Sequence, residues 1–278
     1  FYAAYNPLNV TVTTTGGTFT YDGKAHEATV TVEGLPSGYT YEASSNDKAT
    51  DVEEGTVPAT CDTLIIKNAE GVDVTNELKI KYVNKFIKIT PRDVFITTPD
   101  ASKVYDGDPL TAEGSISGLV EGETVSFITT GTQTEVGISD NTYILEWTGS
   151  AKKSNYTIKD TKGKLTVVPQ SIDRESSQYL NAEVNDPENF KYDGKEHVFQ
   201  PIVTDAKGNE LVEGTDYTVS YDTENFTDVH TITVTVTGIG NYEGTVKKTY
   251  DITRRNVILE SATASKVFDG NPLTDEKV

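Results

Sequence analysis

Two histidines occupy the same place in two related stretches of this sequence, and they are the first candidates for chemistry. His26 and His197 each lie five residues after the tyrosine of a Tyr-Asp-Gly triplet. Zinc binding or general-base catalysis would need such side chains to converge, but these two lie far apart in the sequence. We therefore expect each to sit at a strand edge beside a neighbouring carboxylate, Glu27 for His26 and Glu196 for His197. His230 has no counterpart.

Acidic pairs are the second candidate. Glu53/Glu54 and Asp186/Glu188 have the residue types that glycosidases use as acid and base, but that reaction needs a deep cleft. The sequence has no zinc-ligand spacing, phosphate-binding loop or nucleophile elbow. We predict that the chain is not an enzyme and that it has no catalytic, cofactor-binding or metal-ligating residue.

Calcium binding is an alternative role for some of the acidic residues. Carboxylates gather after two of the joins between repeats described below, and calcium held by such oxygens would stiffen a chain of domains. No EF-hand spacing is present, so we expect solvated acidic loops, with inter-domain calcium as the rival hypothesis. The residues concerned are Asp93, Asp100, Asp106, Asp173, Glu175 and Asp186.

Cys61 is the single cysteine, so no intrachain disulfide can form. It precedes the apolar stretch 64–66, which predicts a buried thiol beside a core strand. A reactive nucleophile is the alternative.

The elements that would position these residues recur along the chain. An aromatic-Asp-Gly phrase, which we call the anchor, begins at Tyr21, Tyr105, Tyr192 and Phe268, at intervals of 84, 87 and 76 residues. Such a period is too long for a solenoid unit and suits a series of small domains. Each complete repeat also has an asparagine at the start of a late strand. These asparagines are Asn76, Asn155 and Asn241.

Two types of anchor alternate. Type A reads Tyr-Asp-Gly-Lys with a histidine two residues later, at 21–26 and 192–197, whereas type B carries Lys-Val before the aromatic residue and Pro-Leu-Thr after it, at 103–111 and 266–274. We predict repeats at 1–90 (type A), 91–168 (type B) and 169–253 (type A), and the start of a truncated type B repeat at 254–278. The last fragment is too short for a sandwich, so we expect the chain to be an excerpt of a longer protein.

Strict alternation of apolar and polar residues dominates the complete repeats. In 231–237, Ile232, Val234 and Val236 alternate with threonines, and the stretches 28–32, 78–82 and 217–221 follow the same rule. Asp-Gly and other glycine turns recur every eight to twelve residues or so, as in antiparallel sandwiches. We predict an all-β fold of tandem Ig-like antiparallel β-sandwiches.

The joins between repeats are short. A proline or an arginine pair separates the strands, at Pro91, Pro169 and Arg254-Arg255. With so little slack, neighbouring repeats should touch end to end in an extended rod, about 100–130 Å long for three sandwiches. Each anchor ring should lie over the end of a core with its hydroxyl in water, ligand stacking being the alternative.

The charge of the chain excludes some partners. With 24 basic and 43 acidic residues its formal net charge is −19, which disfavours nucleic acid and anionic membranes. No apolar stretch is long enough to span a membrane, and we find no signal peptide or sorting tail in this segment. We expect neither nucleic-acid binding nor membrane insertion.

The repeated residues resemble a known family. Lys103 to Thr111, the Gly118-Leu119-Val120-Glu121-Gly122-Glu123 segment and Ser154 to Ile158 are similar to the YDG/MBG class of bacterial Ig-like repeats, as are the 192–195, 213–217 and 238–244 segments. The first repeat departs from this pattern at 61–74, where a long hairpin is inserted. The resemblance implies an Ig-like fold and an extracellular, cell-wall-attached place on Gram-positive bacteria, and it transfers no catalytic residue.

The leading functional prediction is a stalk or spacer of a cell-surface adhesin that projects a binding tip or forms a surface fibre. The partner would be a host glycoprotein or matrix ligand bound by the parent protein, with lateral or fibre self-association as a further expectation. One alternative is that the repeats bind host glycans or mucin-type proteins by avidity, and another is an accessory segment of a large secreted glycosidase. Clustered exposed aromatic rings would favour the glycan alternative. The candidates are Tyr39, Tyr41, Trp147, Tyr179 and Phe226.

Overall fold

The computed structural model describes residues 6–260 and 263–274 of the chain. Residues 1–5 of the predicted first repeat, and 261–262 and 275–278 of the predicted fourth, lie outside the described residues. The chain divides into two compact units: unit 1 comprises residues 1–101, 111–132 and 138–165, and unit 2 comprises 102–110, 133–137 and 166–278. The boundaries at 90, 168 and 253 stay predictions, and we keep the repeat ranges as names for segments.

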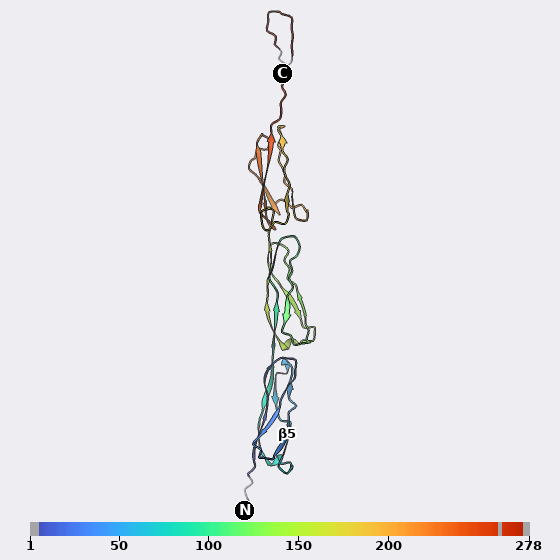
Figure 1. The fold of residues 1–278 in the computed structure, drawn as a ribbon, viewed down its shortest axis with the longest axis vertical. Helices are drawn as coiled ribbons and strands as arrows, with labels where there is room; N and C mark the ends of the chain where they lie inside the picture. Colours follow the sequence, from blue (N-terminus) through green and yellow to red (C-terminus); the bar gives the residue numbers. More distant parts are fainter. Residues whose placement is uncertain (1–5, 261–262, 275–278) are drawn as a thin grey trace, which may run out of the picture. The chain divides into compact units, whose positions relative to one another are not determined.

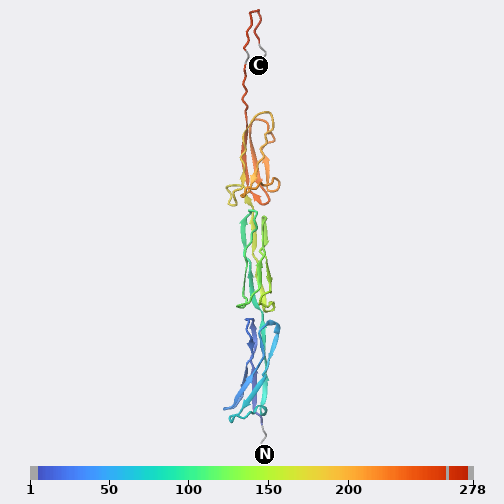
Figure 2. The ribbon, with the colours of Figure 1, turned by 90° about the vertical axis from the view of Figure 1, so that its right-hand side faces the viewer.

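The first repeat, in unit 1, consists of short strands and two 3-10 turns (Figures 1 and 2, blue to cyan). In chain order its elements are β1 (Asn9–Thr14), β2 (Gly17–Thr20), β3 (His26–Glu27), β4 (Val30–Glu33), β5 (Thr40–Ser44), β6 (Lys48–Ala49), η1 (Val52–Glu54), β7 (Thr56–Ala59), β8 (Thr63–Lys67), η2 (Thr75–Glu77), β9 (Lys79–Val83) and β10 (Lys85–Thr90). Its main sheets have the orders β4-β1-β9 and β2-β10-β7, beside the pairs β3-β6 and β5-β8.

The first strand shows how alternation produces the sandwich. In β1, Val10, Val12 and Thr14 are buried while the residues between them are more exposed, as expected for a strand with one face on the core. Because β1 pairs in parallel with β9 and antiparallel with β4, the sheets are mixed where an antiparallel arrangement was expected. A strand near the start of the repeat that lies beside one near its end, as β1 beside β9 and β2 beside β10, runs parallel to it when both run from the entry end to the exit end.

The second repeat follows after the single residue Pro91. Its elements are β11 (Arg92–Thr97), β12 (Ala101–Val104), β13 (Ser115–Ser117), β14 (Ser126–Thr129), β15 (Gly137–Asp140), β16 (Tyr143–Glu146), η3 (Lys153–Asn155), β17 (Tyr156–Thr161) and β18 (Lys164–Val168). They form the sheets β13-β11-β17, β12-β18-β15 and β14-β16. The boundary between the two units falls inside β12, β15 and β18.

The third repeat, in unit 2, has one long sheet and two short pairs (Figure 1, yellow to orange). Its strands are β19 (Gln170–Ser171), β20 (Glu183–Val184), β21 (Phe190–Lys191), β22 (Val203–Thr204), β23 (Tyr217–Tyr221), β24 (Thr231–Gly238), β25 (Tyr242–Glu243) and β26 (Thr245–Thr253). The four-stranded sheet has the order β21-β26-β24-β23, and the pairs are β19-β25 and β20-β22. The strands predicted at 217–221 and 231–237 are present, and the all-β prediction is confirmed.

The first strand of the third repeat is split. In the other repeats one strand, β1 or β11, pairs with neighbours on both sides. Here β19 pairs with β25, β20 pairs with β22, and residues 172–182 separate the two short strands. The sheet is therefore open between β20 and the first half of β26.

The hydrophobic core of unit 1 is continuous across Pro91. One cluster includes Ile87 and Ile89, from the last strand of the first repeat, and Val94 and Ile96, from the first strand of the second. All four are at most 2% exposed. Burial of this kind stabilises by about 25 cal/mol per Å² of apolar surface. The join is therefore flanked on both sides by side chains of one packed core and is not a free linker.

The chain after β26 differs from the complete repeats. Its described residues, 254–260 and 263–274, contain no strand, and Val267 and Phe268 are about nine-tenths exposed (Figure 1, dark red). Among the described residues, no helix has the length and apolar character that crossing a membrane requires.

Substitution in β24 should test the alternation directly. Ile232 is fully buried, so Ile232→Ala should lower the free energy of unfolding by about 2–5 kcal/mol. Ile138→Ala is the control, because that side chain is 68% exposed and its loss should change the free energy by less than about 0.5 kcal/mol. Urea unfolding followed by circular dichroism measures both, and equal effects would contradict the assignment of faces.

Candidate functional site

The four anchors share one local structure. Gly23, Gly107, Gly194 and Gly270 have φ between 75° and 82°, the left-handed region that glycine enters without a Cβ clash. The preceding aspartate accepts a hydrogen bond from the backbone N–H two residues later, at Lys24, Asp108, Lys195 and Asn271. The turn is thus an Asx turn encoded by local residues. It forms even at Phe268, in the segment without strands.

The second partner of the anchor aspartate distinguishes the two types. In type A it is the histidine: His26 Nε2 lies 3.1 Å from Asp22, and His197 Nε2 lies 2.9 Å from Asp193. In type B it is the lysine three residues earlier, as in Lys103–Asp106 (2.5 Å). Our expectation that Glu27 and Glu196 would pair with the histidines was wrong.

The reason is the position of the imidazole ring. His26 stacks on Phe19 at 4.1 Å between ring centroids, and His197 stacks on Phe190 at 4.7 Å. This stacking turns each ring toward the Asx turn. The histidines are therefore parts of the turn, and the two do not form one site.

One backbone hydrogen bond ties each anchor to the strand that leaves its repeat. The N–H groups of Tyr21, Tyr105 and Tyr192 donate to the carbonyl oxygens of Thr90, Val168 and Thr253, each at 2.9 Å. The anchor ring therefore lies next to the join in all three complete repeats. This placement brings it to the residues that follow the join.

Joint 1, as we call the contact between the first two repeats, is built around two tyrosines and one carboxylate. Tyr21 lies edge-on to Tyr156, with ring centroids 5.5 Å apart and an interplanar angle of 81°, a favourable aromatic geometry. Both hydroxyl groups donate to the carboxylate of Glu123, and Tyr156 Oη accepts the N–H of Val120 at 2.9 Å. The hydroxyl of Tyr21 is thus bonded inside the joint, where we expected it to be in water.

An asparagine side chain completes joint 1. Asn155 is fully buried. Its Oδ1 accepts the N–H of Val52 at 2.9 Å, and its Nδ2 donates to Asp51 at 2.6 Å. Lys152 also pairs with Asp51 at 2.5 Å, and Ser154 donates to Glu53. The residues of the second repeat thereby satisfy both the carboxylate and an N–H of the first.

Joint 2, between the second and third repeats, uses the same residue types. Tyr105 lies edge-on to Tyr242, with centroids 5.6 Å apart and an interplanar angle of 83°. Asn241 Oδ1 accepts the N–H of Val136 at 2.9 Å, and Asn241 Nδ2 donates to Glu135. All of these residues belong to unit 2, and Tyr105 packs against the buried cluster that contains Ile172 and Val236.

Burial governs the electrostatics of both joints. It raises the pKa of Tyr21 and Tyr242 well above 10.0, and hydrogen bonding to Glu123 raises that of Tyr21 further. The pKa of Tyr156 rises to about 12 for the same two reasons. The Lys152 ammonium holds the pKa of Asp51 below its usual range, against the effect of burial. Both joints therefore require neutral phenols, and joint 1 also requires the charged form of the Asp51 carboxylate.

The residues that the joint asparagines bridge were not predicted from the sequence. Asp51-Val52 and Glu135-Val136 each follow a threonine, and the same Thr-Asp/Glu-Val triplet recurs at 227–229 in the third repeat. This triplet is a third repeated motif, beside the anchor and the late asparagine, and it could have indicated these residues. It is short, and it begins 29 residues after the anchor tyrosine in the first two repeats but 35 residues after it in the third.

The acidic residues considered for calcium do not converge. Asp100 accepts the Lys164 N–H, Asp173 accepts that of Glu175, and Asp186 pairs with Lys248. Asp106 belongs to its Asx turn, and Asp93 is exposed on β11. Within the described residues no three His, Cys, Asp or Glu side chains form a group that could hold a metal ion. Inter-domain calcium stays an untested hypothesis.

The remaining chemical candidates have structural partners. Glu54 accepts the N–H groups of Thr50 and Asp51 at the start of η1, and His230 Nδ1 lies 2.8 Å from the carbonyl oxygen of Asp228. Cys61 is half-buried, its thiol contacts the Thr63 carbonyl oxygen, and burial raises the pKa of the thiol. That direction disfavours the reactive thiolate.

The five aromatic rings considered as a sugar platform are dispersed. Trp147 stacks on Tyr156 at 5.6 Å next to joint 1. Tyr39 packs against the cluster of Val10 and Ile66, and Phe226 packs against the cluster of Ile232 and Tyr250. Tyr179 is half-buried, and only Tyr41, 42% exposed, stands well out of a core.

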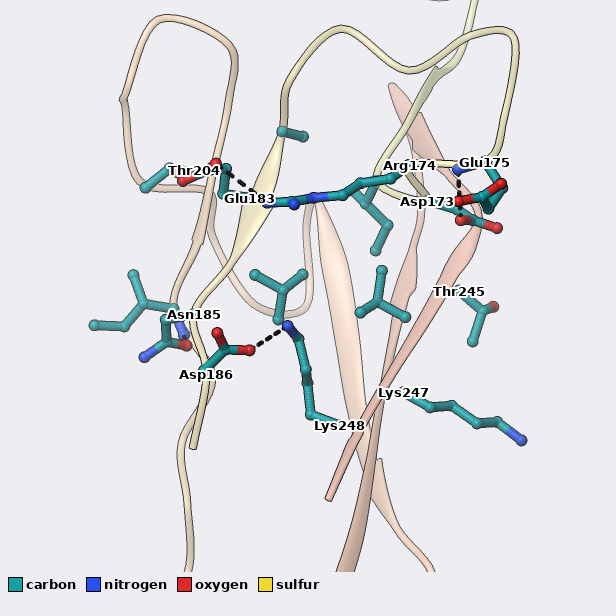
Figure 3. Close-up of a pocket in the computed structure, with 15 residues that line it drawn as sticks. Asp173, Arg174, Glu175, Glu183, Asn185, Asp186, Thr204, Thr245, Lys247 and Lys248 are labelled. Atoms are coloured by element: carbon teal, nitrogen blue, oxygen red, sulfur yellow. Dashed lines mark hydrogen bonds and ion pairs between the residues drawn. The ribbon is translucent and has the colours of Figure 1, made fainter. Parts of the chain in front are cut away.

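A cavity follows the split strand of the third repeat (Figure 3). It has a volume of about 650 Å³, and buried Ile172 and Ala182 are among its lining residues. Four of its charged residues form two ion pairs, Arg174 with Glu183 at 3.3 Å and Lys248 with Asp186. None of the fifteen residues drawn in Figure 3 is aromatic, so the cavity offers no ring for stacking a sugar.

A comparison with known protein families supports the resemblance seen in the repeated residues. Residues 94–166 match the family model of the MBG domain (YGX type). The resemblance to MBG/YDG-type repeats is therefore confirmed for this segment, which contains Glu123, Asn155 and Tyr156 of joint 1. No curated protein matches the chain.

Two solved structures are similar at a low level. The first is the N-terminal eight Ig domains of Down Syndrome Cell Adhesion Molecule isoform 1.30.30, with 11% identity, a TM-score of 0.19, and coverage of 88% of this chain and 35% of that chain. The second is protocadherin gamma B2 extracellular cadherin domains 3–6, with 10% identity, a TM-score of 0.20, and coverage of 89% and 71%. This chain thus spans about a third of the length of the first. The fold rests on the chain's own strand pairing, since TM-scores this low show no shared arrangement.

Removing the joint asparagines should weaken both joints alike. Asn155→Ala leaves the Val52 N–H without its acceptor and removes one donor from Asp51, which keeps Lys152. Asn241→Ala likewise takes the acceptor from the Val136 N–H and a donor from Glu135. Each substitution should lower the free energy of unfolding by about 1–3 kcal/mol. Asn76→Ala, at an exposed asparagine of the first repeat, is the matched control. Urea unfolding measures all three, and a control as destabilised as the variants would refute the assignment.

Alkaline titration should report the burial of joint 1. Because the pKa of Tyr156 is raised from 10.0 to about 12, the folded state favours the neutral phenol. Its contribution to stability is complete below pH 10 and is lost as the pH rises through about 12. In an ultraviolet titration of phenolate, Tyr156→Phe should remove a phenol that ionises late. Loss of one that ionises near pH 10 would contradict the geometry.

Proposed function

We propose that this chain is a structural spacer in an extracellular bacterial surface protein, with its repeats held in contact by joints 1 and 2. The observation that carries the proposal is that two joints use the same aromatic pair and the same asparagine bridge. A chain in which each repeat bound a ligand separately would not need such a contact. A spacer needs it at every join.

The continuous core supports the proposal. A flexible linker would leave the ends of neighbouring repeats to water, but the cluster of unit 1 runs from Ile87 to Val94 through the join. Bending at Pro91 would expose these side chains and break the hydrogen bonds of Asn155. Stiffness is therefore a consequence of burial, and it is the property that a stalk requires.

The wider setting belongs to the same proposal. The MBG match of residues 94–166 agrees with the resemblance of the repeats to surface proteins of Gram-positive bacteria. We propose cell-wall attachment through the parent protein, a host glycoprotein or matrix ligand bound elsewhere in it, and no catalytic role for this segment. The dispersed aromatic rings, and the lack of any ring among the residues that line the cavity of the third repeat, favour this function over glycan binding by the repeats.

Solution scattering of the chain and of a joint-breaking variant should test the spacer. The wild-type chain should give a narrow distribution of long dimensions, and Tyr21→Ala/Tyr105→Ala should broaden it because both aromatic pairs are lost. Tyr41→Ala removes an exposed ring outside the joints and should change nothing. A wild-type chain as flexible as the double variant would refute the spacer. Specific binding of the wild-type chain to a glycan array would favour the avidity alternative.

A further inference from the structure

The third repeat carries one half of a joint whose other half is not filled. Its anchor tyrosine, Tyr192, is 40% exposed, whereas Tyr21 in joint 1 is 4% exposed. Val229 of the Thr227-Asp228-Val229 triplet is 44% exposed, whereas its counterpart Val52 packs against the core of unit 1. The same residue types that are covered in joint 1 are open to solvent here.

This half-joint is already ordered. The Tyr192 N–H donates to Thr253 at 2.9 Å, as the Tyr21 N–H does to Thr90. Asp193 forms its Asx turn with Lys195, and Asn225 holds the triplet by donating to the Asp228 carboxylate at 2.8 Å. A partner would therefore meet a surface that needs little rearrangement, which lowers the entropic cost of docking.

Joint 1 shows which partner fits. There a type A repeat precedes a type B repeat, and Arg92, just after the join, donates from Nε to the Gly118 carbonyl oxygen at 2.7 Å. The third repeat is also type A. Its exit sequence at 252–255, Ile-Thr-Arg-Arg, matches Ile-Thr-Pro-Arg at 89–92, so Arg255 takes the place of Arg92. A type B anchor then follows at 266–274.

We propose that Tyr192, Asp228 and Val229 form a docking surface for the Asn-Tyr end of a type B MBG repeat joined directly after the third repeat. This inference rests on the proposed spacer function. The partner must supply an asparagine to bridge Asp228 and the Val229 N–H, and a tyrosine to lie edge-on to Tyr192. It must also supply a carboxylate for the Tyr192 hydroxyl and a lysine for Asp228, as Glu123 and Lys152 do in joint 1.

A second copy of this chain does not meet these requirements. The end that it would present is that of the first repeat, where Leu78 follows Asn76-Glu77 in the place of the tyrosines Tyr156 and Tyr242. Without the ring, the edge-on contact with Tyr192 cannot form. The surface therefore selects a particular end within a tandem chain and does not promote head-to-tail assembly of copies.

A chimera tests the surface. Residues 91–168 are appended after Thr253 of the chain 1–253, which makes the new join Ile-Thr-Pro-Arg as in joint 1. Hydrogen exchange of the Val229 amide is measured in the chimera and in the parent chain. A new hydrogen bond of ordinary strength should slow this exchange about tenfold. Asn155→Ala in the appended copy alone should abolish the slowing and leave Val52 unchanged. Residues 6–90 have Leu78 in the place of Tyr156. Appending them instead should leave the exchange of the Val229 amide unchanged.

The outcomes separate the two proposals. The docking surface is overturned if the Val229 amide exchanges at the same rate in the chimera and the parent chain. The spacer proposal then stands, provided that the Val52 and Val136 amides are protected in both. Unprotected Val52 and Val136 in the parent chain overturn the spacer itself. Protection of Val229 that appears in the parent chain as its concentration rises identifies a second copy as the occupant and overturns the choice of a type B repeat.

Discussion

A single carboxamide makes the contact between successive repeats possible. In joint 1 it belongs to Asn155, and in joint 2 to Asn241, and in each it accepts a backbone N–H and donates to a carboxylate. A neutral amide carries both an acceptor and two donors in one plane, so it can satisfy both groups together. If these groups were buried without it, the cost would offset much of the gain from packing the tyrosines. The aromatic contact depends on this bridge.

The length of the join is the second constraint. Only Pro91 separates β10 from β11, so the end of one core is brought against the start of the next. Proline has no N–H to leave unpaired and fixes its own φ, which suits a crossing between two strands. Because side chains on both sides of Pro91 are buried in one cluster, packing as well as the covalent chain holds the two repeats together. The anchor turn, held by its N–H on the exit strand, adds the ring that covers the join.

The many acidic residues of the chain have a local explanation in its turns. Asp22, Asp106 and Asp193 accept N–H groups of the anchor turns, and Asp205 accepts those of Lys207 and Asn209. An aspartate in such a turn replaces a backbone acceptor and lets the chain reverse in few residues. A low pKa follows from these hydrogen bonds, as at Asp22 and Asp193. A repeat with many tight turns therefore becomes acidic without a metal site.

The parts of the structure that depend on neighbouring residues follow from the order of the residues alone. Alternation placed Ile232, Val234 and Val236 on the core face of β24, and Asp-Gly specified the anchor turns, which form even at Phe268 where no strand surrounds them. The residues that meet across a join depend instead on the folded arrangement of the sheets. Tyr21 and Tyr156 are 135 positions apart, and the short Thr-Asp/Glu-Val triplet begins 29 residues after the anchor in the first two repeats but 35 in the third. Contacts over such sequence distances depend on how whole sheets pack end to end, and no local pattern encodes that packing. The split between β19 and β20 was likewise not visible in any local pattern.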